Sequence, residues 1–193
     1  MATTSKSTTE SSLYTLPNQV SAGRLVLAVV LFVLLAFDLM VSALVVFVIA
    51  ASTDALDGYL ARRYAQVTTL GRILDPFVDK VVVLGAFIFL LPVPGSGLEA
   101  WMVMVVVARE LMVTALRSHL ERQGADFSAS LSGKLKMVVQ CVAIGWIMFF
   151  LAAFADTDHA PWAAWVRDVL NWLAVLVTLA SGVVYLRRAF ELL

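Results

Sequence analysis

The chain has few of the features that mark a soluble or a secreted protein. Only 15% of its 193 residues are charged, whereas 61% are hydrophobic, and its mean hydropathy is +0.91. These values lie far outside the averages of soluble domains, so they predict an integral membrane protein. The single cysteine, Cys141, excludes an intrachain disulfide. Because it lies in an apolar run, we expect a buried, unreactive thiol.

An excess of basic charge is also absent. The 14 Lys and Arg residues balance the 14 Asp and Glu residues, so nothing in the composition indicates a nucleic-acid partner. Residues 1–12 are rich in Ser and Thr and lack the basic region, apolar core and cleavage site of a signal peptide. We therefore expect a short disordered tail over 1–12 and a single six-helix membrane domain over 13–193.

Long apolar runs fill the rest of the chain and predict an all-α protein with six transmembrane helices. The run from residue 25 to 62 would make roughly 60 Å of helix, twice the ~30 Å hydrocarbon core, so it must hold two spans. Asp38 is the predicted turn between them. A short N-terminal interfacial helix, with Pro17 at its start and Asn18 as a candidate cap, is expected over 16–24. The predicted spans are 20–37, 39–62, 71–91, 98–120, 131–154 and 162–188.

Basic residues fall on one side of these spans. With the N-terminus inside, 13 of the 14 Lys and Arg residues lie on or toward the cytoplasmic side, and only Arg167 lies outside. This agrees with the positive-inside rule, and six spans then place both termini in the cytoplasm. Trp101, Trp162 and Trp165 are predicted to form an interfacial belt on the outer face.

Four acidic residues interrupt this apolar chain at helical spacing. Asp54 and Asp57 are three residues apart near the end of the second span, and Asp75 and Asp79 are four apart in the first turns of the third. Each pair projects from one helical face, and a short loop brings the pairs together at the cytoplasmic mouth. Clustered carboxylates need cations in a low-dielectric site. Oxygen ligands suit Mg²⁺ or Mn²⁺, and we expect two ions.

Small residues accompany the acidic pairs. Gly58 and Ala61 follow the first pair on its helix, and Gly71 lies one turn before Asp75. Such side chains let a bulky substrate approach the backbone closely, although they also occur at ordinary helix contacts. Arg62 can reach anionic oxygens nearby. The combination with the acids favours a substrate site.

The whole pattern resembles the signature of the CDP-alcohol phosphatidyltransferase family, membrane enzymes that transfer a phosphatidyl or related group from a CDP-linked donor to an alcohol. The resemblance implies six transmembrane helices, a cytoplasmic active site, divalent metal ions and a homodimer. It implies a bacterial inner-membrane location and a donor, CDP-diacylglycerol, bound in part by Asn18. The eight matching positions are Asp54, Asp57, Gly58, Ala61, Arg62, Gly71, Asp75 and Asp79.

Four further stretches resemble the branch of this family that makes phosphatidylglycerophosphate from glycerol 3-phosphate. Met137 departs from that branch, in which a threonine is expected. The stretches are Pro17-Asn18-x2-Ser21-x2-Arg24, Leu74-Asp75-Pro76-x2-Asp79-Lys80, Arg109-Glu110-x6-Arg117 and Ser132-Gly133-Lys134-x-Lys136.

Basic residues near the same membrane face suit such an acceptor. Glycerol 3-phosphate is a dianion, so its pocket needs fixed cations, and Arg109, Arg117, Lys134 and Lys136 are the candidates. Anchoring at the cytoplasmic surface remains the alternative for the two lysines. Tyr185 could reach the same cavity or anchor the membrane interface, and we expect anchoring.

The expected mechanism divides the acidic residues by role. Asp54, Asp57 and Asp75 hold the metal ions, while Asp79 acts as general base and also touches a metal. The products are phosphatidylglycerophosphate and CMP. Two alternatives stay open: the same family with inositol, inositol phosphate, serine or phosphatidylglycerol as acceptor, and a small cation transporter.

Overall fold

The computed structural model describes residues 16–64, 69–122, 131–154 and 161–191, so the predicted tail over 1–12 lies outside the described residues. Within these ranges the protein is all-helical and has no strand. The helices are α1 (Leu16–Ala36), α2 (Met40–Tyr64), α3 (Thr69–Leu90), α4 (Ala100–Arg122), α5 (Leu131–Ala153) and α6 (Pro161–Phe190).

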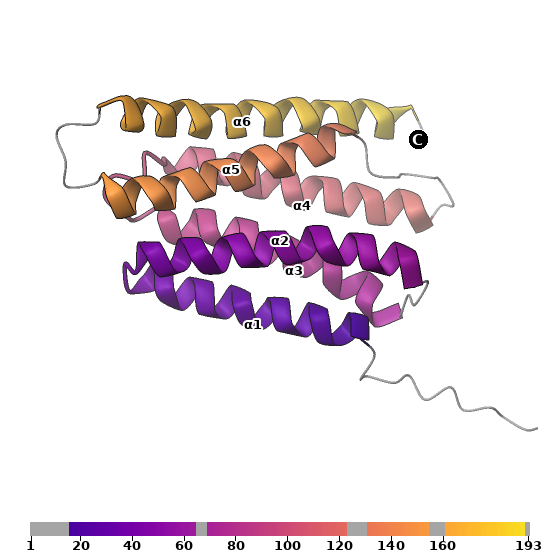
Figure 1. Ribbon diagram of the computed structural model, residues 1–193. Coiled ribbons are helices and arrows are strands. Elements are labelled where there is room, and N and C mark those ends of the chain that lie inside the picture. Colours follow the sequence, from indigo (N-terminus) through magenta and orange to yellow (C-terminus); the bar gives the residue numbers. More distant parts are fainter. Residues whose placement is uncertain (1–15, 65–68, 123–130, 155–160, 192–193) are drawn as a thin grey trace, which may run out of the picture.

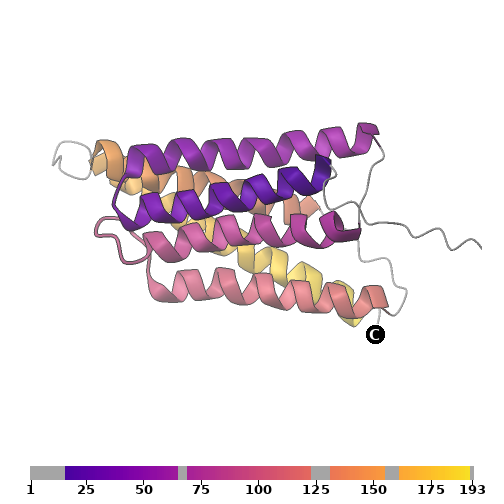
Figure 2. The ribbon, with the colours of Figure 1, turned by 90° about the horizontal axis from the view of Figure 1, so that it is seen from below.

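The six helices lie side by side and alternate in direction (Figure 1). The start of α1, the end of α2, the start of α3 and the end of α6 therefore lie at one end of the bundle, which we call the motif end (Figures 1 and 2). Helix α1 contacts α2 and α3, α5 contacts α2, α3 and α6, and α4 contacts α3 and α6.

The predicted helix boundaries are confirmed closely, with one correction at the N-terminus. The largest difference is four residues, because α1 begins at Leu16 where residue 20 was expected. The separate interfacial helix expected over 16–24 is wrong, since α1 runs unbroken to Ala36. Pro17 lies in the first turn, where a proline N–H has no helical partner to lose, so it does not interrupt the helix.

Asp38 forms the turn between α1 and α2, as predicted. Its φ is +57°, a left-handed conformation that Asp adopts more readily than most residues. The amide of Leu39 donates to the carbonyl of Leu34 at 2.9 Å, and the amide of Asp38 donates to that of Leu35 at 3.1 Å. These two bonds define a Schellman cap, which ends α1 without glycine or proline.

Substitutions at Asp38 should report on this cap. Asp38→Gly is expected to keep the thermal midpoint in detergent or raise it slightly, because glycine adopts positive φ without a Cβ clash. Asp38→Val is expected to lower the free energy of unfolding by about 1–2 kcal/mol, since a β-branched residue is strained in that conformation. A glycine variant less stable than the valine variant would contradict this account.

A buried apolar core joins α1 to α5. Leu31 and Leu35 of α1 pack in it with Phe87 of α3 and with side chains of α2, α4 and α5. Gly85 of α3 allows α1 to approach closely, because a Cβ there would lie 2.1 Å from Cζ of Phe32. The two helices are therefore held in close contact near the middle of the bundle.

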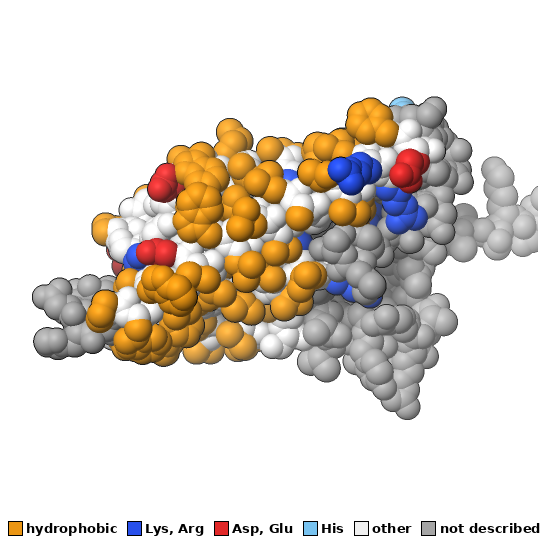
Figure 3. Space-filling model, turned by 90° about the horizontal axis from the view of Figure 1, so that it is seen from above, with side chains coloured by type: hydrophobic (Ala, Val, Ile, Leu, Met, Phe, Trp, Pro, Cys, Tyr) orange, Lys and Arg blue, Asp and Glu red, His pale blue; other side chains and the backbone are white. Residues whose placement is uncertain are grey.

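The outer surface of the bundle is apolar along much of its length. Figure 3 shows hydrophobic side chains over this length and charged side chains toward the two ends. Among the described residues, Gly133–Ala153 and Pro161–Phe190 are long and apolar enough to cross a membrane, and Ala22–Ala36, Met40–Thr53 and Lys80–Leu90 are shorter apolar helices. These findings indicate membrane association, while the full set of six spans stays a prediction.

Candidate active site

The predicted acidic residues lie on two helices at the motif end. Helix α2 carries Asp54 and Asp57 in its last turns, and α3 carries Asp75 and Asp79 in its first turns. Only residues 65–68 separate the two helices, so the end of α2 lies within about 18 Å of the start of α3. The side chains of these four residues lie outside the described part of the chain, and the metal site stays a prediction.

The other predicted donor residues lie in α1, α2 and α3. Helices α1 and α5 each contact both α2 and α3, so the two halves of the motif are held by shared neighbours. The side chains of these residues also fall outside the description. They are Asn18 in α1, Gly58, Ala61 and Arg62 in α2, and Gly71 in α3.

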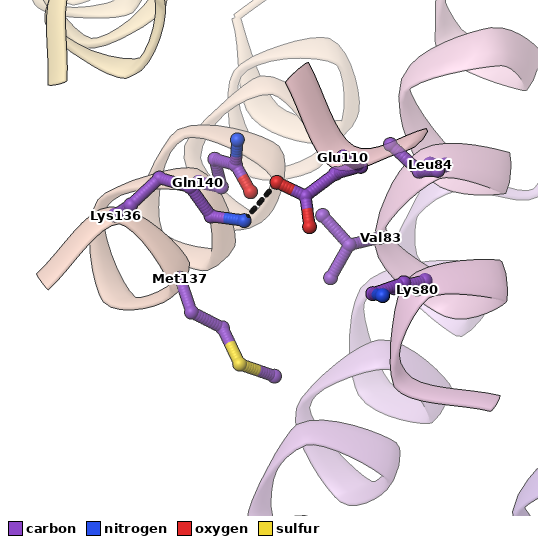
Figure 4. Close-up of a pocket in the computed structure, with 7 residues that line it drawn as sticks. All are labelled: Lys80, Val83, Leu84, Glu110, Lys136, Met137 and Gln140. Atoms are coloured by element: carbon purple, nitrogen blue, oxygen red, sulfur yellow. Dashed lines mark hydrogen bonds and ion pairs between the residues drawn. The ribbon is translucent and has the colours of Figure 1, made fainter. Parts of the chain in front are cut away.

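A cavity of about 140 Å³ lies between α3, α4 and α5 (Figure 4). Its α3 wall begins at Lys80, the residue after Asp79, and Val83 lies one helical turn after Asp79. The cavity therefore adjoins the segment of α3 that carries the second acidic pair. The lining residues are Lys80, Val83, Leu84, Glu110, Lys136, Met137 and Gln140.

Glu110 joins two cations at the cavity wall. Its Oε1 accepts a hydrogen bond from Nη1 of Arg109 at 2.8 Å and a second from Nζ of Lys136 (Figure 4 draws the latter). All three side chains are buried. Buried charges are stable only when paired, and the pairing here leaves one positive charge uncompensated within the trio. Lys80 of α3 also lines the cavity.

Helix α6 holds Arg109 behind this wall. Nη2 of Arg109 donates to Oγ of Ser181, and the guanidinium carbon lies 5.1 Å from the centre of the Tyr185 ring. Gly182 gives the side chain room, since a Cβ there would lie 3.3 Å from Cγ of Arg109. A hydrogen bond and a cation–π contact from α6 thus fix the guanidinium that binds Glu110.

The structure separates the four predicted acceptor residues. Lys136 lines the cavity, and Arg109 joins it through Glu110. Arg117 is half-buried on α4, two turns beyond Arg109. Lys134 is exposed, because residues two apart on a helix point in nearly opposite directions and Lys136 points inward. The structure does not bring Lys134 to the cavity.

Comparison with known proteins identifies the family. The sequence pattern described as CDP-alcohol phosphatidyltransferase matches residues 14–180, which is most of the chain. The chain belongs to the CDP-alcohol phosphatidyltransferase family. It is therefore a transferase, and the resemblance drawn from the acidic motif is confirmed.

Relatives of this phosphatidyltransferase carry more specific names. The CDP-diacylglycerol–glycerol-3-phosphate 3-phosphatidyltransferase of Bacillus subtilis is 37% identical over 149 residues, 77% of this chain and 74% of the relative. The protein of the same name in Salmonella choleraesuis is 35% identical over 165 residues, which are 84% of this chain and 86% of the relative. A protein of Mycobacterium tuberculosis named "Probable phosphatidylglycerophosphate synthase" is 36% identical over 151 residues, which are 78% of this chain and 67% of the relative.

Sequence reasoning missed part of the cavity of this phosphatidyltransferase. Glu110 and Lys80 stood inside stretches that resemble the family, yet neither was predicted as a site residue, and Gln140 was not considered. A signal existed for Glu110, because an ionisable residue inside an apolar helix marks a functional site by default. The prediction that Tyr185 anchors the membrane interface is wrong. Its side chain is 3% exposed and packs against Arg109.

Proposed function

We propose that this phosphatidyltransferase transfers the phosphatidyl group of CDP-diacylglycerol to the C1 hydroxyl of sn-glycerol 3-phosphate, releasing CMP and phosphatidylglycerophosphate. The observation that carries the proposal is the cavity with Lys80 and Lys136 on its walls, directly beside the α3 segment that bears Asp79. Fixed cations suit a dianionic acceptor and are not needed for serine or inositol. The names of the bacterial relatives support the same acceptor.

The proposal includes the placement of the enzyme in the bacterial inner membrane. All six helices cross the bilayer, with both termini and the active site on the cytoplasmic side, and the enzyme works as a homodimer. The apolar outer surface supports a place in the bilayer, and the start of α1 and the end of α6 lie at the same end of the bundle, as termini on one side of the membrane require (Figures 1 and 3). The basic residues of the sequence also favour that orientation.

The carboxylates fit a divalent metal centre in their chemistry and spacing. Asp54, Asp57, Asp75 and Asp79 supply oxygen ligands from two consecutive helices, a donor set that suits two Mg²⁺ or Mn²⁺ ions. When bound, the ions neutralise the donor diphosphate and the charge that develops on the departing CMP. Asn18, Gly58, Ala61, Arg62 and Gly71 are the proposed contacts to the rest of the CDP group.

The residues of the chain then divide the transfer step between them. Asp79 removes the proton from the C1 hydroxyl of glycerol 3-phosphate. The hydroxyl oxygen forms a bond to the β-phosphorus of the donor, the bond from that phosphorus to CMP breaks, and CMP leaves with the electron pair. Lys80 and Lys136 hold the acceptor phosphate in the cavity. The adjacency of Asp79 and Lys80 in the sequence of α3 supports this division of roles.

A panel of acceptors tests the proposed function. Purified enzyme in mixed micelles receives CDP-diacylglycerol and Mg²⁺ with glycerol 3-phosphate, serine, inositol, inositol phosphate or phosphatidylglycerol, and CMP release is measured. We expect glycerol 3-phosphate to support turnover at least about 100-fold faster than the others, because the other acceptors lack a dianionic phosphate for Lys80 and Lys136 or do not fit the cavity. Faster turnover with any other acceptor than with glycerol 3-phosphate would contradict the proposed acceptor.

A further inference from the structure

We infer that Glu110 is a positioning residue of the acceptor site, which holds the ammonium of Lys136 in the orientation that binds the acceptor phosphate. The inference rests on the proposed function, because it assigns to Glu110 a task within that same cavity. Glu110 acts through Lys136 and takes no part in the chemical step.

The first argument is the convergence of two cations on one oxygen. Arg109 of α4 and Lys136 of α5 both donate to Oε1 of Glu110, although they come from different helices. A lysine side chain has four rotatable bonds and about 2 kcal/mol of rotamer entropy to lose when it is fixed. A buried carboxylate that accepts a hydrogen bond from the ammonium fixes it before the substrate arrives, so binding of the acceptor costs less.

The second argument is that Glu110 is itself held from behind. Arg109 binds Glu110 on one side and Ser181 and Tyr185 of α6 on the other. In addition, Oγ1 of Thr114 accepts a hydrogen bond from Lys80 and donates one to the backbone carbonyl of Glu110 at 2.6 Å. The carboxylate thus connects Arg109, which α6 holds, to Lys136 of α5, while Thr114 connects Lys80 of α3 to the backbone of Glu110.

The third argument is the charge of the cavity. Without Glu110, the buried charges of Arg109 and Lys136 would lose the carboxylate that both contact and would repel each other in a site of low dielectric. With Glu110, the trio keeps one net positive charge, which suits an anionic acceptor. A cluster that only joined helices would need no surplus charge and no cavity beside it, whereas Glu110 and Lys136 both line the cavity (Figure 4).

Kinetics with both substrates test the inference. In Glu110→Gln the KM for glycerol 3-phosphate is expected to rise about tenfold or more, because the ammonium of Lys136 is no longer held. The KM for CDP-diacylglycerol is expected to change less than about twofold, since that substrate is bound elsewhere. Glu110→Asp keeps the charge and should give an intermediate KM for the acceptor. Glu191→Gln, an exposed glutamate after α6, is the matched control and should resemble the wild type.

A double-mutant cycle separates positioning from a merely structural role. If Glu110 acts through Lys136, the Glu110→Gln change should raise the acceptor KM in the wild type and have no further effect in Lys136→Met. An equal rise in both backgrounds, or equal rises for both substrates, would overturn the inference while leaving the proposed function intact. Should Glu110→Gln fail to fold, as judged by gel filtration and the thermal midpoint, the cycle is run with Glu110→Asp. A wild-type enzyme that does not use glycerol 3-phosphate would overturn both proposals.

Discussion

Asp79→Asn is expected to lower CMP release by about 100-fold or more, the usual contribution of a general base to catalysis. Asparagine has nearly the same size as aspartate, but its amide cannot take the proton of the acceptor hydroxyl. The measurement is CMP release by purified enzyme with CDP-diacylglycerol, glycerol 3-phosphate and saturating Mg²⁺. Saturation with metal matters because Asp79 is also a proposed metal ligand.

Asp38→Asn is the matched control for this experiment. Asp38 is exposed at the end of the bundle opposite the motif end, and asparagine also adopts its positive φ. The control should keep wild-type turnover and stability. Turnover of Asp79→Asn within about twofold of the wild type would remove Asp79 from the role of base, since even a weak general base contributes more than that.

Removal of divalent metal ions is expected to abolish CMP release altogether. Chelation with EDTA leaves four carboxylates and the donor diphosphate without the cations that neutralise them, so the donor should no longer bind productively. Addition of Mg²⁺ or Mn²⁺ in excess of the chelator should restore turnover. Unchanged turnover in EDTA, with total metal verified by elemental analysis, would exclude the proposed metal centre.

A variant of the metal centre distinguishes binding of the ions from a general effect of the chelator. Asp57→Asn should raise the Mg²⁺ concentration needed for half-maximal turnover by at least about tenfold, because a neutral amide is a weaker ligand than a carboxylate. Glu99→Gln changes an exposed carboxylate next to Trp101, near the start of α4, and should leave that concentration unchanged. Equal Mg²⁺ requirements in the wild type and Asp57→Asn would contradict the assignment of Asp57.

The helices could be predicted well because their signals are local. Apolar runs too long for one span required a turn, and Asp38 was the polar residue available in the middle of the first run. The beginning of α1 was less predictable, since a proline in the first turn is compatible with a new helix or with a continuing one. Hydropathy alone could not decide between these possibilities.

The site was predicted in part, because helical spacing shows which residues share a face but not which face points inward. Lys134 and Lys136 have the same chemistry, yet packing against α3 and α4 turns only Lys136 toward the cavity. Tyr185 was assigned to the surface for the same reason. Its burial depends on Arg109, which lies more than 70 residues away in the sequence. Contacts of this kind follow from the tertiary structure and not from a local pattern.

The contacts of α5 have a consequence for how the enzyme forms during synthesis. Both α2 and α3, which carry the acidic motif, pack against α5, and α5 in turn packs against α6. The motif is therefore translated early, but the surfaces that hold it are completed only when the last two helices have left the ribosome. A chain that stops after α4 would leave Glu110 without Lys136 and Arg109 without Ser181 and Tyr185, so its charged residues would lose the partners that make their burial tolerable.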